Sequence, residues 1–299
     1  MYALDITAVV TMFDSGGSTG ILRDEFGVLP PGDVRRCILA LSDGPRAEIL
    51  RKLFAYRFDV GKLGANGGGR GHSFGNLLLV ALTSIYGSDI EGIKKASELL
   101  DIQGRVLPVS LDKAQLVATL ENGEEVIGEG NIDEPKHDGA LHITGLKLQP
   151  AAALFDETRD AITDAALVVI CPGDLYTSII PNLVVDGMRE ALQESNAQKI
   201  CIVPLMSKWG ETHGFKASDA VKELLQYSGS QKFDHVICNT TKPDAGQLDA
   251  YAKEKQWPIE FDADALSKYT DNVITGDFSS ESDLARHDSD KLAKVIADL

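Results

Sequence analysis

The chain has 299 residues, 43% hydrophobic and 25% charged, so it can fold around a full hydrophobic core. Its 45 acidic residues outnumber 29 basic ones and give a net charge of −16, which argues against binding to nucleic acid or to an anionic membrane surface. No apolar run approaches the ~20 residues of a membrane span, and the four cysteines are scattered without a paired spacing. We therefore expect a cytoplasmic protein. Because the chain is acidic as a whole, any phosphate site should be a local cluster of arginines and backbone N–H groups.

The first half of the chain begins with one strand pattern and several helix patterns, and then contains only short β-type runs. Residues 4–11 form an apolar run typical of a buried strand. Apolar residues at helical spacing follow in four segments: 33–41, 46–58, 73–87 and 89–101. Residues 104–148 contain short β-type runs, two of them joined by the turn signal Glu121-Asn122-Gly123-Glu124. This region predicts an antiparallel β excursion.

The second half alternates strands and helices again. Strands are predicted at 166–171, 199–205, 235–238 and 258–262, and helices at 151–164, from Asn182, from Ser218, at 245–255 and at 285–298. Apolar strands that alternate with helices favour an α/β fold with a mostly parallel, doubly wound sheet. With no repeat and no low-complexity linker, residues 1–299 are expected to form a single domain.

Three glycine-rich loops follow three of the predicted strands. They are "DSGGSTG" (14–20), "CPGDLYTSIIPN" (171–182) and "MSKWGETHGF" (206–215). Ligands of parallel α/β sheets bind beyond the carboxyl ends of the strands. One such loop is most often only a turn, but three at the same edge of a sheet indicate a nucleotide site.

The first loop supplies an acid and flexible backbone. Asp14 can hold a ribose hydroxyl or a divalent metal such as Mg²⁺, or it can simply open the loop as an Asx turn. Gly16 and Gly17 allow close approach of a ligand, and Ser18 adds a hydroxyl.

Further residues suit an anionic ligand. Arg23 and Arg35, with the adjacent Arg36, can offset phosphate charge, although salt bridges to the many acids are an alternative for each arginine. The stretch "LGANGGGRGHSFGN" (63–76) is either a surface loop or an anion cradle, with Arg70, His72 and Asn76 facing the anion. The second loop contributes further candidates: Gly173, Asp174, Thr177, Ser178 and Asn182.

These motifs, in this order, resemble the CofD-like family over essentially the whole chain. The resemblance rests on "DSGGSTG", "LPPGD", "GHSFGN", "CPGDLYTSIIPN" and "GETHGF". It implies a Rossmann-like three-layer fold with a nucleotide-derived ligand. The "LPPGD" and "LYTS" elements are most similar to the bacterial gluconeogenesis-factor branch of the family.

The two branches of the family imply different functions. The gluconeogenesis-factor branch implies a UDP-sugar-binding regulator of central carbon metabolism and cell shape, without an established reaction. The CofD branch implies a magnesium-dependent transferase that moves a phospholactyl or phosphoenolpyruvyl-type group from a guanosine diphosphate donor to a deazaflavin, in coenzyme F420 synthesis. We expect the regulator, with the transferase as the alternative. The sequence leaves open whether the protein is a monomer or a homodimer.

The resemblance also assigns two residues near the carboxyl terminus. Tyr251 and Arg286 match family positions that contribute to UDP-sugar binding. A tyrosine ring can stack on uracil, and a guanidinium can bind a diphosphate through two nitrogens. The alternatives are helix packing for Tyr251 and pairing with neighbouring acids for Arg286.

Two features depart from the family pattern. Asp14 is followed by Ser15 where the family pairs two acids, which weakens a two-carboxylate metal site. The family's first strand and its glycine-rich turn, which precede the strand at 4–11, have no counterpart here. We expect either a gene start assigned too late or a sheet with a gap, and a gap would leave apolar strand edges unpaired.

Overall fold

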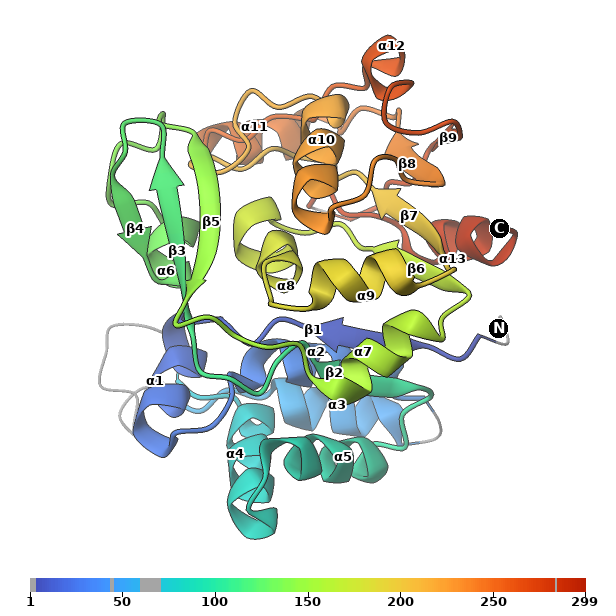
Figure 1. Cartoon of the computed structure of the whole chain (residues 1–299). Coiled ribbons are helices and arrows are strands. Elements are labelled where there is room, and N and C mark those ends of the chain that lie inside the picture. The colour runs from blue at the N-terminus through green and yellow to red at the C-terminus, as the bar shows by residue number, and fades with distance from the viewer. Residues whose placement is uncertain (1–3, 44–45, 60–70, 283) are drawn as a thin grey trace.

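A computed structural model describes residues 4–43, 46–59, 71–282 and 284–299. Its parallel strands form two sheets (Figure 1). In the first sheet β1 (Thr7–Val10) pairs with β2 (Arg105–Pro108). The second sheet has the order β6-β7-β8-β9, formed by Leu167–Ile170, Gln198–Ile202, His235–Asn239 and Val273–Gly276. The predicted α/β class with parallel strands is confirmed.

The second sheet is buried on both faces because its apolar residues alternate between two clusters. Ile200 and Ile202 of β7 pack with Leu292 of α13 (Ser289–Ala297), whereas Cys201 lies in the larger core that contains Val221 of α10 (Ala217–Ser228). Successive residues of a strand point to opposite faces. The continuous apolar run of β7 therefore fits a sheet covered by helices on both sides.

Each parallel sheet has an open edge within the described part of the chain. Strand β1 pairs only with β2, and β6 pairs only with β7. All four residues of β6 are only half-buried, in contrast to the fully buried Ile200, Cys201 and Ile202 of β7.

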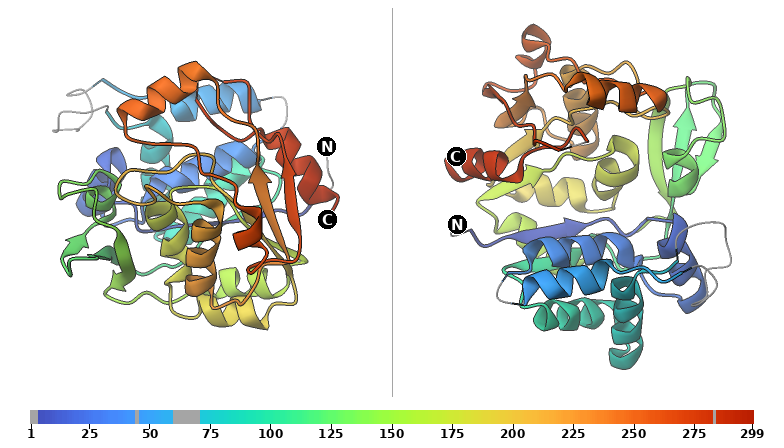
Figure 2. Two further views of the ribbon diagram at one scale, coloured as in Figure 1. Left: turned by 90° about the horizontal axis from the view of Figure 1, so that it is seen from above. Right: turned by 180° about the vertical axis from the view of Figure 1, so that it is seen from behind.

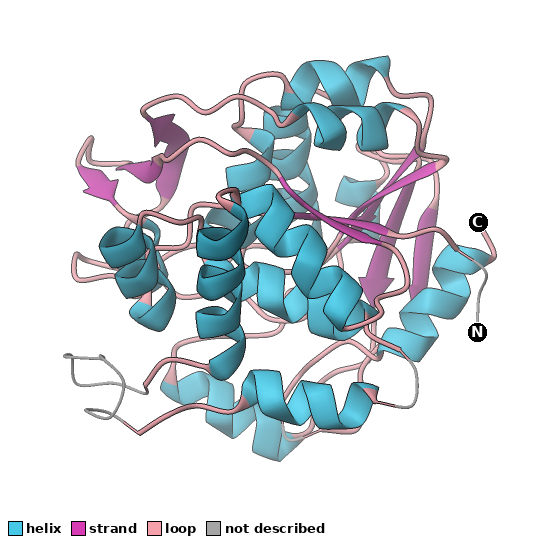
Figure 3. Ribbon diagram, turned by 90° about the horizontal axis from the view of Figure 1, so that it is seen from below, coloured by secondary structure: helices cyan, strands magenta, loops and turns pink. Residues whose placement is uncertain are grey.

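Helices surround the first sheet (Figures 1 and 2). They are α1 (Gly17–Phe26), α2 (Pro31–Leu41), α3 (Ala47–Ala55), α4 (Phe74–Tyr86) and α5 (Asp89–Leu99). Seen from below, helices dominate this end of the molecule (Figure 3). The other helical elements are α7 (Asp156–Thr163), a π turn (Leu175–Ile179), α8 (Ile180–Leu183), α9 (Met188–Glu194), α11 (Ala245–Lys253) and α12 (Ala263–Leu266).

The predicted antiparallel excursion is a separate sheet of order β4-β3-β5. Its strands are β3 (Gln115–Leu120), β4 (Glu125–Ile127) and β5 (Ile143–Gln149), and the short helix α6 (Glu129–Asp133) follows β4. This sheet lies beside α1, at the left in Figure 1. The run at 104–110 does not belong to it, because β2 pairs in parallel with β1.

Three other local predictions are wrong. The first loop is mostly the helix α1. The segment 258–262 makes only isolated bridges, from Pro258 to Met206 and from Glu260 to Lys216, and the fourth strand of the sheet is β9. The helix predicted from Asn182 is divided between the end of α8 and α9, because Gly187 adopts a φ of +95° between them.

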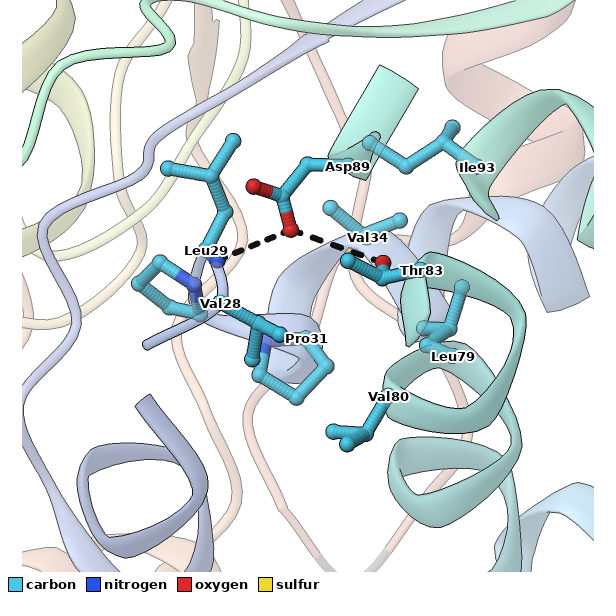
Figure 4. A pocket seen from close by; sticks show the side chains of 10 residues that line it. Val28, Leu29, Pro31, Val34, Leu79, Val80, Thr83, Asp89 and Ile93 are labelled. Atoms are coloured by element: carbon cyan, nitrogen blue, oxygen red, sulfur yellow. Dashed lines mark hydrogen bonds between the residues drawn. The ribbon is translucent and has the colours of Figure 1, made fainter. Parts of the chain in front are cut away.

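The "LPPGD" motif forms the start of α2 and is held by hydrogen bonds. The Asp89 carboxylate accepts from the Leu29 backbone N–H at 3.1 Å and from the Thr83 hydroxyl at 3.4 Å (Figure 4). A cavity of about 10 Å³ beside these residues, against Pro31, has room for at most one water. The motif therefore serves helix packing at this place.

Among the described helices, none has both the length and the apolar character needed to cross a bilayer.

Candidate functional site

A pocket of about 350 Å³ lies beyond the carboxyl ends of β6 and β7. Its lining includes Gly173 and Asp174 after β6, Lys208 after β7, and Tyr251 and Arg286 from the carboxyl-terminal part of the chain. Four of these five residues were predicted from the sequence. The volume falls in the range of small-molecule sites, and the position is the one expected for ligands of parallel sheets.

A buried carboxylate shapes the loop after β6. Glu211 is fully buried and accepts hydrogen bonds from the Tyr176 backbone N–H at 2.7 Å and from the Thr177 hydroxyl at 3.0 Å. Burial raises the pKa of Glu211 to about 7, against the pull of the nearby Lys208 ammonium. Glu211 therefore ties the loop after β7 to the loop after β6.

Two predicted phosphate ligands have internal partners. The Thr177 hydroxyl donates to Glu211, and the Asn182 amide donates to the carbonyl oxygens of Ser178 at 2.9 Å and Ile179 at 3.3 Å. Neither Thr177 nor Asn182 lines the pocket. In the structure these side chains support the wall of the pocket.

Lys208 lies among three carboxylates at the rim of the pocket. Its ammonium donates to Asp133 and, at 2.8 Å, to Asp174, and it lies 3.6 Å from Glu211. Burial alone would lower the pKa of Lys208, but Glu211 and Asp174 outweigh burial and raise it. Carboxylate oxygens of the three acids lie within 4.8 Å of one another and could also hold a metal ion. A metal there would compete with the lysine for the same oxygens.

The carboxyl-terminal wall joins α11 to the segment before α13. The Tyr251 hydroxyl donates to the Ala285 carbonyl at 3.4 Å, and the Gln247 amide donates to the Ser282 carbonyl at 2.7 Å. These contacts place Tyr251 next to Arg286 although 34 residues separate them.

His287 is a pocket residue that the sequence reasoning missed. Its ring hydrogen-bonds the Val203 carbonyl, and its buried Nε2 has no partner among the described residues. Burial lowers the pKa of His287, so the ring is neutral at pH 7 and presents an acceptor nitrogen. Only its position next to Arg286 could have suggested a role.

Asp14 forms the Asx turn that was the alternative prediction. Its Oδ1 accepts from the Gly16 backbone N–H at 2.8 Å. The Ser15 backbone N–H donates to Glu129 of α6 at 3.2 Å, and the Ser15 hydroxyl accepts from Gly130 N–H at 3.0 Å. Burial, and next the charge of Asp14, raise the pKa of Glu129 to about 7. Glu129 therefore supplies the second acid that is missing next to Asp14 in the sequence.

A second group of predicted residues gathers where α1, α2 and α4 meet. The Ser18 hydroxyl hydrogen-bonds His72 Nδ1 at 2.8 Å, and Arg35 Nε donates to Asn76 Oδ1 at 2.9 Å. Among the other predicted residues, Gly17 is exposed with a φ of +44°.

The other arginines differ from Arg35. Arg23 pairs with Asp24 at 2.8 Å, and Arg36 pairs with Asp33 at 3.0 Å, as in the salt-bridge alternative. Arg70 lies outside the described residues.

Helix α6 connects the first loop to the pocket. Glu129 at its start contacts the first loop, and Asp133 at its end contacts Lys208 at the pocket. The sequence reasoning assigned no chemistry to this helix, because nothing local to it shows that the antiparallel sheet returns to the nucleotide loops.

Comparisons with known proteins agree on one family. The profile of the family described as 2-phospho-L-lactate transferase CofD matches residues 1–279. The gluconeogenesis factor of Bacillus subtilis is 36% identical over 99% of this chain and 90% of its own length. A Thermotoga maritima protein that carries the same name provisionally is 44% identical over 98% of this chain and 91% of its own length.

A solved structure shows the same fold. The crystal structure of protein BH3568 from Bacillus halodurans matches with a TM-score of 0.89 and 37% identity, over 98% of this chain and 91% of the other. A second structure of that protein describes it as a member of the UPF0052 family.

Proposed function

Because this chain belongs to the CofD family, we propose that it binds a nucleotide sugar of the UDP type and acts as a regulator of central carbon metabolism and cell shape. Its relatives are named gluconeogenesis factors, which supports the regulatory branch over the transferase. The observation that carries the proposal is the pocket beyond β6 and β7, where Gly173, Tyr251 and Arg286 meet.

Each part of a nucleotide has a suitable partner in the pocket. The Tyr251 ring offers a face for the base, and the Arg286 guanidinium offers two parallel donors for the diphosphate. Gly173 lets the backbone approach the phosphates. The acceptor Nε2 of His287 suits the N3–H donor of uracil, or a ribose hydroxyl.

Magnesium would be held at the first loop under this proposal. Asp14 and Glu129 form a half-buried pair of carboxylates, and hard oxygen ligands of this kind suit Mg²⁺. A bound cation would favour the charged form of Glu129 and offset the charge of a nearby phosphate. The Asp133, Asp174 and Glu211 cluster is less suitable, because the Lys208 ammonium already occupies its carboxylate oxygens.

The transferase remains a second candidate for one specific reason. A carboxyl group with a pKa near 7 is suited to proton transfer at neutral pH, and Glu129 is such a group beside Asp14. Turnover of a guanosine diphosphate donor and a deazaflavin by the purified protein would favour this candidate.

Calorimetry of the purified protein with a UDP-sugar, UDP, GDP and GTP tests the proposal. We expect binding of the UDP-sugar, and loss of measurable binding in Tyr251→Ala and in Arg286→Ala with melting temperatures within a few degrees of wild type. Tyr86→Ala is the control, since Tyr86 is a half-exposed tyrosine at the end of α4, outside the pocket. Unchanged affinity in both pocket variants, or tighter binding of GDP than of UDP, would contradict the proposal.

A further inference from the structure

Arg35 is a largely buried arginine whose guanidinium forms no ion pair with a described carboxylate. The residue is 8% exposed, and its hydrogen bond to a described residue joins Nε to Asn76 Oδ1 at 2.9 Å. The charge of Asp33 acts on Arg35, but the Asp33 carboxylate is hydrogen-bonded to Arg36, and the positive charges of Arg36 and Arg57 act on Arg35 as well. A guanidinium stays protonated in proteins, and a buried charge without a counter-charge is costly. Arg35 is therefore expected to have a partner that is not part of the described chain.

The surroundings of Arg35 are built to receive an anion. Asn76 is 1% exposed and His72 2% exposed, and the Asn76 amide also donates to the Ser18 hydroxyl at 3.4 Å. Helix α4 begins here, with Ser73 as its N-cap, so its positive dipole end faces the same place.

Close packing fixes the arginine in this position. A Cβ on Gly75 would lie 2.6 Å from Cδ of Arg35, so only glycine lets the stem of the arginine lie against the first turn of α4. On the other side, Ser18 is half-buried and Gly17 exposed, which leaves an approach from solvent.

We propose that Arg35, Asn76, Ser18 and His72 form a second binding site, for a phosphate group. None of these four residues lines the pocket of Tyr251 and Arg286. The phosphate belongs either to the far part of the nucleotide ligand or to a separate phosphorylated metabolite. The inference goes beyond the proposed function and does not require it, because it rests on the burial of Arg35 and on the polar groups around it.

The substitution Asn76→Asp tests the site in the full-length protein. It places a carboxylate of nearly the same shape beside Arg35 and so supplies the missing counter-charge from within the chain. The measurement is the melting temperature in increasing inorganic phosphate, with chloride adjusted to constant ionic strength. We expect wild type to gain about 3 °C near saturation, and Asn76→Asp to show no gain. Without phosphate, the variant should melt at or above the wild-type temperature.

Two further variants keep the test decisive. Ser18→Ala removes one half-buried hydroxyl and should weaken phosphate binding about 5-fold, which gives a reading even if Asn76→Asp does not fold. Lys52→Gln removes an exposed positive charge on α3, away from Arg35, and should leave the phosphate effect unchanged. No phosphate effect in wild type, or a full effect in both Asn76→Asp and Ser18→Ala, would overturn the inference.

Competition with UDP identifies the source of the phosphate. If the group is part of the nucleotide ligand, saturating phosphate should raise the apparent dissociation constant of UDP in wild type but not in Asn76→Asp. If it is a separate metabolite, phosphate and UDP should bind independently. A protein that responds to phosphate through Asn76 and fails to bind any nucleotide would refute the proposed function and leave this site standing.

Discussion

Replacing Glu129 by glutamine should stabilise the protein at alkaline pH. In the folded state Glu129 lies beside Asp14, and burial together with that charge raises its pKa from 4.5 to about 7. A carboxyl group whose folded pKa is raised contributes stability below its unfolded pKa and loses it as the pH rises toward the folded pKa. The loss should therefore occur between about pH 4.5 and pH 7. Glutamine keeps an oxygen for the Ser15 N–H and never acquires the charge.

The size of the effect follows from the difference between the pKa values of Glu129 in the unfolded and folded states. They lie about 2.5 pH units apart, and one unit corresponds to about 1.4 kcal/mol, so the upper limit is about 3 kcal/mol. Because Glu129 is only half-buried, solvent screening reduces this figure. We expect the stability of Glu129→Gln relative to wild type to increase by about 1–2 kcal/mol between pH 5 and pH 8.

Urea unfolding at pH 5, 6, 7 and 8, in the presence of EDTA to remove divalent cations, measures this difference. Glu211 has a similarly raised pKa, but its contribution is common to both proteins and cancels in the comparison. Glu134→Gln, at an exposed position just after α6, is the matched control and should give a difference that does not vary with pH. A constant difference for Glu129→Gln as well would refute the reasoning.

Three further outcomes are expected. Mg²⁺ should raise the melting temperature of wild type at pH 8 and leave Asp14→Asn unchanged; an equal rise in both would place the ion elsewhere. Thr177→Val should lower the free energy of unfolding by about 1–3 kcal/mol, measured with urea, because the buried Glu211 carboxylate loses a donor; an unchanged value would mean that this bond contributes nothing. His287→Phe keeps the ring but not the acceptor nitrogen, and should weaken UDP binding about 5-fold in calorimetry, whereas unaltered affinity would exclude a contact through Nε2.

Apolar patterning was sufficient for the parallel α/β class. In β7 the apolar residues Ile200, Cys201 and Ile202 alternate between two buried clusters, as expected for a strand covered on both sides. The antiparallel sheet was equally predictable, because its hairpin turn is a local signal. By contrast, the strand β9 was missed and 258–262 was wrongly preferred, since a short apolar run becomes a strand only when a partner lies beside it.

The candidate site was predictable in its parts and not in its assembly. Glycines and hydroxyls after strands indicated the loops after β6 and β7, which line the pocket, and family resemblance indicated Tyr251 and Arg286. The pairing of Asp14 with Glu129, 115 residues away, had no local signal. The internal bonds of Thr177 and Asn182 were equally hidden, because a hydroxyl or amide in a loop can face a ligand or a neighbouring loop with the same sequence around it.

The sequence by itself therefore determined the fold class, the loops at the carboxyl ends of β6 and β7 and the family, because periodicity, turn chemistry and motif order are local properties of the chain. The first predicted loop, 14–20, follows β1 of the other parallel sheet and does not line the pocket. The tertiary structure alone decided which charges meet. It paired Glu129 with Asp14, enclosed Lys208 among three acids and left the largely buried Arg35 with a neutral hydrogen-bond partner. Those contacts depend on distances between segments far apart in sequence, and electrostatic energies depend on such distances and on burial.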